Sequence, residues 1–127
     1  MIDKTKAFPG FSVNDLQKAK DFYGKTLGLE VSEPQMPGAL HLNVNGNKIF
    51  VYQKDNHQPA SFTILNFPVD NVEKTVDELS KKGIQFEHYS GGEIATNDKG
   101  IHEEEGMKIA WFKDPAGNYL SILEGEM

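Results

Sequence analysis

The sequence has no cysteine among its 127 residues. Disulfide bonds, thiolate metal sites and a cysteine nucleophile are therefore excluded, and the composition fits a reducing compartment. A long apolar run is missing as well, because no stretch approaches the roughly 20 residues that span a bilayer. Residues 1–4 do not begin like a secretory signal peptide. We therefore expect a cytoplasmic protein without a membrane partner.

The chain also lacks an excess of positive charge, because its formal net charge is −6. Binding to nucleic-acid phosphates needs clustered cationic side chains, and the lysines here are scattered. The densest charged cluster is acidic, at residues 103–105, and is interpreted as a solvated loop. The sequence therefore predicts no nucleic-acid partner.

The chain is long enough for one domain, residues 1–127, with a real core. Within it, one pattern occurs twice. Polar residues 14–17 and 70–73 each precede a helical pattern, 56 positions apart, and each half closes with Gly-Asn and an apolar strand, at 46–53 and 117–124. We divide the domain into module 1, about residues 5–55, and module 2, about residues 60–126.

The first module is predicted to contain four strands and one helix. Asn14 and Gln17 stand at capping-box spacing, and Gly28 follows where a helix commonly ends. The helix between them has an apolar stripe formed by Leu16, Ala19, Tyr23 and Leu27. The predicted strands are 8–13, 29–32, 39–44 and 48–53, the last two joined by a turn at 45–47.

The second module repeats this order, with Asp70 and Glu73 as the capping box and Gly83 as the helix stop. Its predicted strands are 62–69, 84–89, 108–113 and 118–124, with a structural turn at 114–117. The closing glycines lie 71 positions apart, so about fifteen extra residues fall within residues 90–106. This segment is either a surface loop or a lid over a ligand pocket.

Two tandem βαβββ modules predict an α+β domain in which each helix covers one face of a mixed sheet and the other face is concave. The motifs resemble the vicinal-oxygen-chelate superfamily, which includes glyoxalase I, bleomycin-resistance proteins and extradiol dioxygenases. The resemblance rests on residues 14–16 (Asn-Asp-Leu), 22–23 (Phe-Tyr), 27–29 (Leu-Gly-Leu) and 112–118 (Phe-Lys-Asp-Pro-Ala-Gly-Asn). It implies the fold of that superfamily over essentially the whole chain, and a homodimer.

The resemblance also implies a divalent metal held by His, Gln or Glu side chains from the first and last strands of each module. The four corresponding positions here are Phe8, Phe50, Ile64 and Ser121. None is a usual ligand, because phenylalanine and isoleucine have no lone pair and a neutral serine is a poor donor. We therefore expect no metal cofactor.

Other polar residues do not restore a metal or catalytic set. Gln53 and Glu124 are equivalent through the repeat and are expected at strand ends in solvent. His41 could face the cavity or be a structural histidine. The remaining histidines, His57, His88 and His102, form no recognisable ligand spacing, and no Ser/His/Asp arrangement or phosphate-binding loop is present.

The predicted site is instead an apolar cleft. Its ligand-binding residues are Phe8, Ser12, His41, Phe50, Ile64, Asn66 and Ser121. Alternatively, these side chains fill the cleft or pack against a second subunit. The corresponding function is metal-free binding of a small amphipathic molecule. Two alternatives stay open: a lyase, isomerase or dioxygenase of the same superfamily with a displaced or absent metal, and a module for interaction or regulation.

Overall fold

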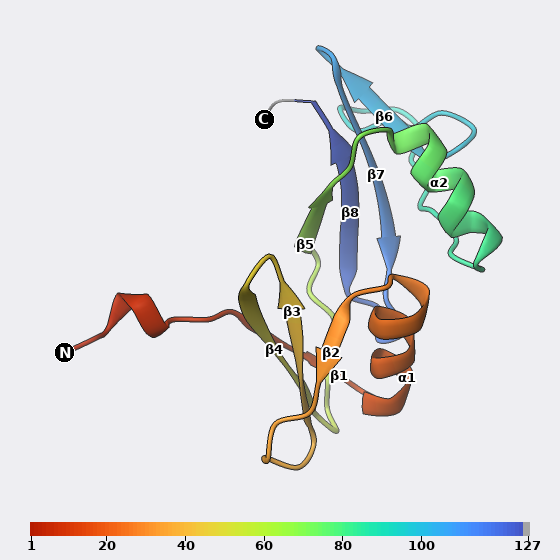
Figure 1. Ribbon diagram of the computed structural model, residues 1–127. Helices are drawn as coiled ribbons and strands as arrows, with labels where there is room; N and C mark the ends of the chain where they lie inside the picture. The colour runs from red at the N-terminus through yellow and green to blue at the C-terminus, as the bar shows by residue number, and fades with distance from the viewer. Residues whose placement is uncertain (126–127) are drawn as a thin grey trace. The chain divides into compact units, whose positions relative to one another are not determined.

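The computed structural model describes residues 1–125. The chain folds into two compact units, Met1–Pro59 (unit 1) and a second that begins at Ala60 (unit 2) (Figure 1). Each unit contains a four-stranded sheet and a helix, so the predicted α+β fold with two βαβββ modules is confirmed. No helix in the described part of the chain is long and apolar enough to cross a membrane.

Unit 1 has a mixed sheet in the order β1-β4-β3-β2, in which only β1 and β4 run parallel. A short 3₁₀ turn, Lys4–Lys6, precedes it, and α1 continues into one π-helical turn, Phe22–Thr26. The elements are β1 Gly10–Val13, α1 Leu16–Asp21, β2 Glu30–Ser32, β3 Ala39–Val44 and β4 Asn47–Gln53.

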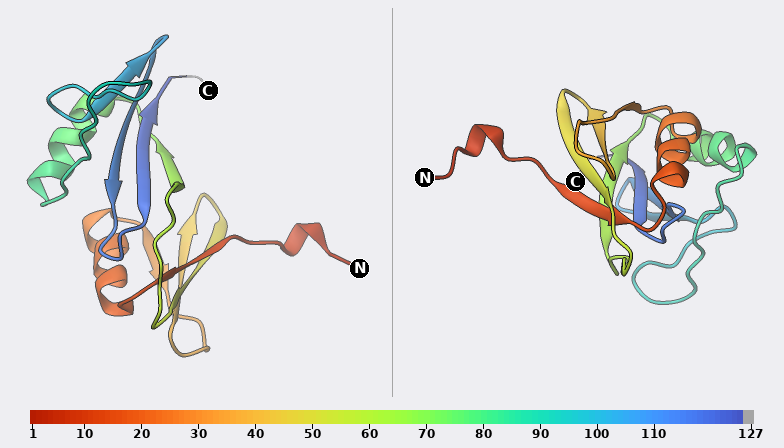
Figure 2. Two further views of the ribbon diagram at one scale, coloured as in Figure 1. Left: turned by 180° about the vertical axis from the view of Figure 1, so that it is seen from behind. Right: turned by 90° about the horizontal axis from the view of Figure 1, so that it is seen from below.

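Unit 2 repeats this topology with the order β5-β8-β7-β6, and β5 and β8 are its parallel pair (Figure 2). Its elements are β5 Thr63–Pro68, α2 Val72–Lys81, β6 Ile101–Glu104, β7 Met107–Lys113 and β8 Tyr119–Glu124.

In each unit the core lies between the sheet and its helix. The ring of Phe11 on β1 lies 5.8 Å from that of Tyr23 next to α1, and Phe86 lies 5.4 Å from Phe112 of β7. Because side chains alternate along a strand, neighbouring residues such as Ser12 and Trp111 belong to the opposite face, here called the helix-free face. The fully buried core side chains include Val13, Tyr23, Leu40, Leu42, Val51, Val72, Phe112 and Leu120.

Both helices begin one residue later than the predicted capping boxes. The N-caps are Asp15 and Asn71, whose side chains accept hydrogen bonds from the N–H groups of Lys18 and Lys74, each at 3.0 Å. The capping roles predicted for Asn14 and Asp70 are therefore wrong. The two observed caps have the same geometry although one is Asp and the other Asn. The side-chain oxygens of both residue types accept equally well from the free N–H of the third helical residue.

A second side chain reaches each helix start from the closing strand of the same unit. Gln53 Oε1 accepts from the N–H of Leu16 at 3.0 Å, and Glu124 Oε1 accepts from the N–H of Val72 at 2.8 Å. Gln53 is exposed, as predicted, whereas Glu124 is only partly exposed, and both side chains are bound. They satisfy backbone donors that a helix start leaves without partners. We call each pair of cap and strand-end side chains a helix clasp.

The chain between α2 and β6 differs from the prediction. Residues 84–89 do not form a strand: Phe86 makes one isolated bridge with Phe112, and the N–H of Glu87 donates to the carbonyl of Trp111 at 2.8 Å. The fourth strand of the sheet is β6, within the stretch assigned to a loop, so Glu103 and Glu104 lie in a strand. The extra residues therefore end at residue 100.

Candidate ligand-binding site

The helix-free face of unit 1 carries an aromatic cluster around Phe50. Phe50 lies over Gly10, its partner in register, so that a Cβ on Gly10 would be 3.1 Å from the Phe50 carbonyl oxygen. Its ring is 6.3 Å from that of Phe8, 6.0 Å from His41 and 5.5 Å from Tyr52, which stacks on it. Phe8 precedes β1, which begins at Gly10 rather than at residue 8 as predicted, and 60% of its surface is exposed. Three of the predicted site residues, Phe8, His41 and Phe50, are thus brought together.

Ser12 lies on the same face, two residues beyond Gly10. Its hydroxyl is 2.6 Å from Nδ1 of His57, and both side chains are partly buried. The sequence analysis did not include His57 among the site residues. The serine hydroxyl thus faces the imidazole of His57.

In unit 2 the two polar residues of the predicted site bind each other. Ser121 is fully buried and donates a hydrogen bond to Asn66 Oδ1 at 2.6 Å. These residues are partners in register, as Gly10 and Phe50 are in unit 1. Ile64 lies at a register shift between Thr63 and Leu65, which interrupts the alternation that was predicted to put Ile64 and Asn66 on one face.

The four positions that correspond to metal ligands do not fit a divalent ion. Phe8 and Phe50 present ring carbons, Ile64 presents an aliphatic side chain, and the Ser121 hydroxyl donates its proton to an amide oxygen. Within residues 1–125 no group of three or more His, Cys, Asp or Glu side chains is placed to hold a metal ion. We therefore derive no chemical step through a metal.

A pocket of about 250 Å³ opens in unit 2 beside the Asn66–Ser121 pair. Trp111 is the partner of Ser121 in register, and Tyr119 stands two residues before Ser121 on the same face. The ring of Tyr89 meets that of Trp111 edge-on at 5.7 Å. The pocket is lined by Ser61, Phe62, Thr63, Tyr89, Ile94, Trp111 and Tyr119, which we call the unit 2 pocket.

None of the seven lining residues was predicted from the sequence, although the repeat contains a signal for one. Trp111 pairs with Ser121 as His41 pairs with Phe50, so the two residues are counterparts, 70 positions apart. His41 was proposed as a cavity residue. The residue at the equivalent position of module 2 is Trp111, so the repeat could have identified it.

The charge of Lys113, near the unit 2 pocket, is paired. Lys113 Nζ lies 5.0 Å from the centroid of the Tyr119 ring and 3.8 Å from Glu87 Oε1. A hydrogen bond with Tyr119, followed by the nearby Glu87 charge, raises the pKa of Lys113. Burial raises the pKa of the Tyr89 phenol, so this hydroxyl stays protonated and can donate a hydrogen bond at neutral pH.

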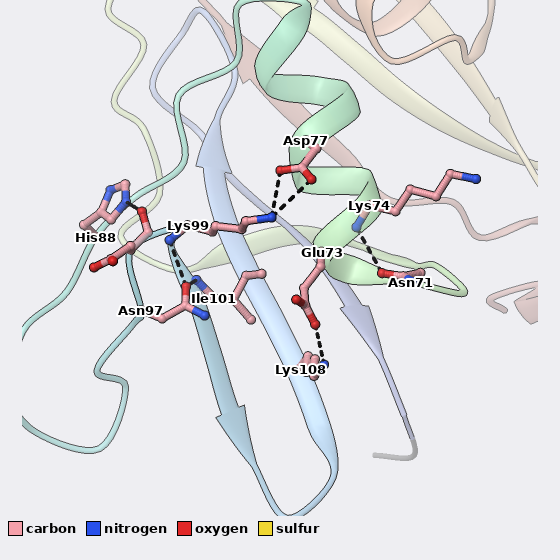
Figure 3. Close-up of polar contacts among 10 residues, drawn as sticks. Asn71, Glu73, Lys74, Asp77, His88, Asn97, Lys99, Ile101 and Lys108 are labelled. Atoms are coloured by element: carbon pink, nitrogen blue, oxygen red, sulfur yellow. Dashed lines mark hydrogen bonds and ion pairs between the residues drawn. The ribbon is translucent and has the colours of Figure 1, made fainter.

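A wider groove of about 490 Å³ lies on the opposite side of the sheet, against α2. Figure 3 shows Lys99 reaching Asp77 of α2, with Nζ 3.1 Å from both carboxylate oxygens. His88 Nε2 is 3.0 Å from the carbonyl oxygen of Asp98. Because this groove lies away from the family positions and its Lys99 charge is already paired, we favour the helix-free face as the candidate site.

The comparisons with known proteins agree with the fold. Residues 7–122 match the model of the Glyoxalase/Bleomycin resistance protein/Dioxygenase superfamily. The uncharacterized protein YraH of Bacillus subtilis (strain 168) is 30% identical over 127 residues, which cover 88% of this chain and 91% of YraH.

Two solved structures show the same fold. One is the fosfomycin resistance protein FosX from Listeria monocytogenes, with a TM-score of 0.74 and 14% identity over 100% of this chain and 97% of FosX. The other is TnmS3, an antibiotic binding protein from Streptomyces sp. CB03234, with a TM-score of 0.64 and 23% identity over 95% of this chain and 97% of TnmS3. The resemblance found in the sequence is confirmed: the chain belongs to the Glyoxalase/Bleomycin resistance protein/Dioxygenase superfamily.

Proposed function

We propose that this protein binds a small amphipathic molecule on the helix-free faces of its sheets without a divalent metal. One observation carries the proposal: side chains at the positions that hold the metal in the family contact other side chains of this protein instead. Phe8 and Phe50 pack against each other at 6.3 Å, and the Ser121 hydroxyl is bound to Asn66. Apolar walls with a few placed polar groups are typical of small-molecule sites.

The names of two structural neighbours support a binding role. FosX is described as a fosfomycin resistance protein and TnmS3 as an antibiotic binding protein, so proteins of this fold include one that binds an antibiotic. We propose a small amphipathic ligand for the present chain, with Phe8, Ser12, His41 and Phe50 as binding residues in unit 1 and Ile64, Asn66 and Ser121 as binding residues in unit 2.

Two further parts of the proposal concern assembly and location. We propose a homodimer in the cytoplasm, in keeping with the family resemblance and the cysteine-free composition. Light scattering at micromolar concentration tests the first part. A mass of about 28 kDa, twice the 14.2 kDa of one chain, is expected, and a mass of one chain would contradict it.

Metal dependence is tested on the pure protein. Its content of zinc, nickel, manganese and iron is measured before and after dialysis against a chelator, together with the melting temperature in the presence of each ion. We expect less than one ion per chain and no saturable rise in melting temperature. A tightly held stoichiometric ion would favour the enzymatic alternative instead.

Ligand binding is tested by thermal stabilisation with a panel of amphipathic compounds, because a ligand at about 100 times its Kd stabilises by about 2.7 kcal/mol. Phe50→Ala removes the centre of the aromatic cluster in unit 1. Met36→Ala is the matched control, since Met36 is an exposed apolar residue of the same unit outside the cluster. Failure of every compound to stabilise the protein would count against a binding function.

A further inference from the structure

The segment that breaks the repeat builds a wall of the unit 2 pocket. In unit 1 the chain passes from Gly28 almost directly into β2, whereas in unit 2 residues 82–100 separate α2 from β6. Figure 2 shows this segment in cyan between the two elements. Its central part, residues 89–96, supplies two lining residues, Tyr89 and Ile94.

Residues 89–96 form a loop that is closed at its base. The N–H of Thr96 donates to the Tyr89 carbonyl at 2.8 Å, and the N–H of Tyr89 donates to Thr96 Oγ1 at 2.8 Å. His102 of β6 holds the loop from the side, with Nδ1 2.9 Å from the carbonyl oxygen of Ala95. These contacts hold the base of the loop, and from the residues between them Ile94 lines the pocket.

The tip has one apolar residue where polar residues would be expected. Residues 90–93 read Ser-Gly-Gly-Glu, and Ile94 follows with 46% of its surface exposed. Exposing an isoleucine side chain to water is unfavourable, whereas burying it against an apolar surface lowers the free energy. Ile94 lines the same pocket as Trp111, so a ligand there would complete its burial.

The lining specifies a neutral ligand. None of the seven lining residues carries a formal charge, and the nearby Lys113 is within 3.8 Å of Glu87. A charged ligand would therefore lose hydration without finding an uncompensated partner. Aromatic side chains favour another ring, which they contact edge-on or with offset stacking.

The size and polar groups narrow the class further. A volume of about 250 Å³ lies below the roughly 300–1,000 Å³ of sites for drug-sized molecules, so one or two rings fit. The hydroxyls of Ser61, Thr63 and Tyr89 can exchange hydrogen bonds with a substituent. We infer that the unit 2 pocket binds a neutral aromatic molecule of one or two rings that carries a hydrogen-bonding group.

This inference rests on the proposed function and goes beyond it in two ways. It gives the ligand class, and it assigns the site to unit 2 alone, with Ile94 as a specificity residue. The family's metal positions, in contrast, are divided between Phe8 and Phe50 in unit 1 and Ile64 and Ser121 in unit 2.

Trp111 gives a direct readout, because the chain has one tryptophan and so one indole N–H signal in a ¹⁵N-correlated NMR spectrum. Three naphthalene probes of similar size differ in charge at neutral pH: 2-naphthol, 2-naphthoate and 2-naphthylmethylammonium. We expect 2-naphthol to shift the Trp111 signal saturably and the charged probes to bind at least about ten-fold more weakly. Equal or tighter binding of a charged probe, or no shift with 2-naphthol, overturns the inference.

Substitutions test the wall of the pocket. Ile94→Ser keeps the loop base and removes the apolar side chain, so we expect about ten-fold weaker binding of 2-naphthol. Ile2→Ser is the matched control, because Ile2 is exposed and lies in unit 1 outside the pocket, and its affinity should equal that of the unchanged protein. Unchanged affinity in Ile94→Ser contradicts the assignment.

Phe50→Ala separates the inference from the proposed function. Phe50 is one of the proposed binding residues of unit 1, so a self-contained unit 2 pocket should lose more affinity for 2-naphthol in Ile94→Ser than in Phe50→Ala. If Phe50→Ala abolishes binding while Ile94→Ser does not, the inference fails and the broader binding function stands. If 2-naphthol does not bind, the inference fails, and the amphipathic panel decides whether the proposed function fails with it.

Discussion

The two units occupy the same positions on their helix-free faces with different side chains. In unit 1 Phe50 lies over Gly10, and in unit 2 Ser121 is bonded to Asn66, the corresponding pair in register. The large ring of Phe50 thus has no large counterpart in unit 2. Gly10 and Phe50 have no side-chain lone pair to offer, and the Ser121 hydroxyl is bonded to Asn66.

The helix clasps, in contrast, are alike. Gln53 and Glu124 both accept from the first helical N–H of their unit, and Asp15 and Asn71 cap the third. Free backbone donors at a helix start need partners wherever they are withdrawn from water. The comparison indicates that backbone hydrogen bonding constrains the repeat more strongly than the face that would contact a ligand.

The largest expected effect concerns the two cores. Phe112 and Leu42 occupy equivalent positions and are fully buried. Phe112→Ala should lower the free energy of unfolding by about 3–5 kcal/mol and Leu42→Ala by about 2–5 kcal/mol, because each leaves a cavity. Guanidinium denaturation followed by circular dichroism measures both. A loss below about 1 kcal/mol at either site would mean that the core relaxes around the cavity.

The next effect concerns the pair of Gly10 and Phe50 and its counterpart in unit 2, Asn66 and Ser121. Gly10→Ala adds a Cβ 3.1 Å from the Phe50 carbonyl oxygen, so we expect a loss of about 1–3 kcal/mol. Asn66→Ala at the equivalent position removes one hydrogen bond and should cost about 1 kcal/mol. The same denaturation experiment applies. If Gly10→Ala were neutral, Phe50 would not be packed over Gly10 as described.

The helix clasp predicts a smaller effect with a built-in control. Glu124→Ala leaves the Val72 N–H without its acceptor and should cost about 0.5–1.5 kcal/mol. Glu124→Gln should retain most of the stability, since Gln53 makes the same bond in unit 1. Equal losses in both variants would show that charge, and not hydrogen bonding, supports this helix start.

The smallest effect is the pH dependence that Glu73 gives to unit 2. The hydrogen bond from Lys108, together with its charge, lowers the pKa of Glu73 below 4.5, its ordinary value. A lowered folded-state pKa adds stability that is present above the ordinary value and is lost as the pH falls through the folded value. Stability measured from pH 6 to pH 3 should therefore fall less in Glu73→Gln. Gln17, the counterpart of Glu73, bonds instead to Asp21 and provides the comparison.

Much of the topology could be predicted because its signals are local. The repeat gives the order of the elements, and the apolar periodicity gives the helix faces. The strand β6 escaped prediction because three of its four residues, His102, Glu103 and Glu104, are polar. Apolar and polar residues alternate in the segment 84–89, which is typical of a strand. In the structure Phe86 packs against Phe112, but the segment makes only one isolated bridge with β7.

The candidate site was only partly predictable. The register of β1 with β4 follows from the repeat, so the association of Phe8, His41 and Phe50 could be anticipated. The unit 2 pocket depends on where residues 89–96 fold, and their position is fixed by contacts with His102 and between Tyr89 and Thr96. No sequence spacing encodes such contacts, so Ile94 could be recognised only in the structure.

The most direct test of metal-free binding is a crystal structure of the protein grown with 2-naphthol after treatment with a chelator. We predict a naphthol ring against Trp111 and Ile94, with its hydroxyl bonded to a lining hydroxyl and no ion beside Phe50 or Ser121. A divalent ion bound at those positions, or a ligand whose binding requires one, would contradict the account.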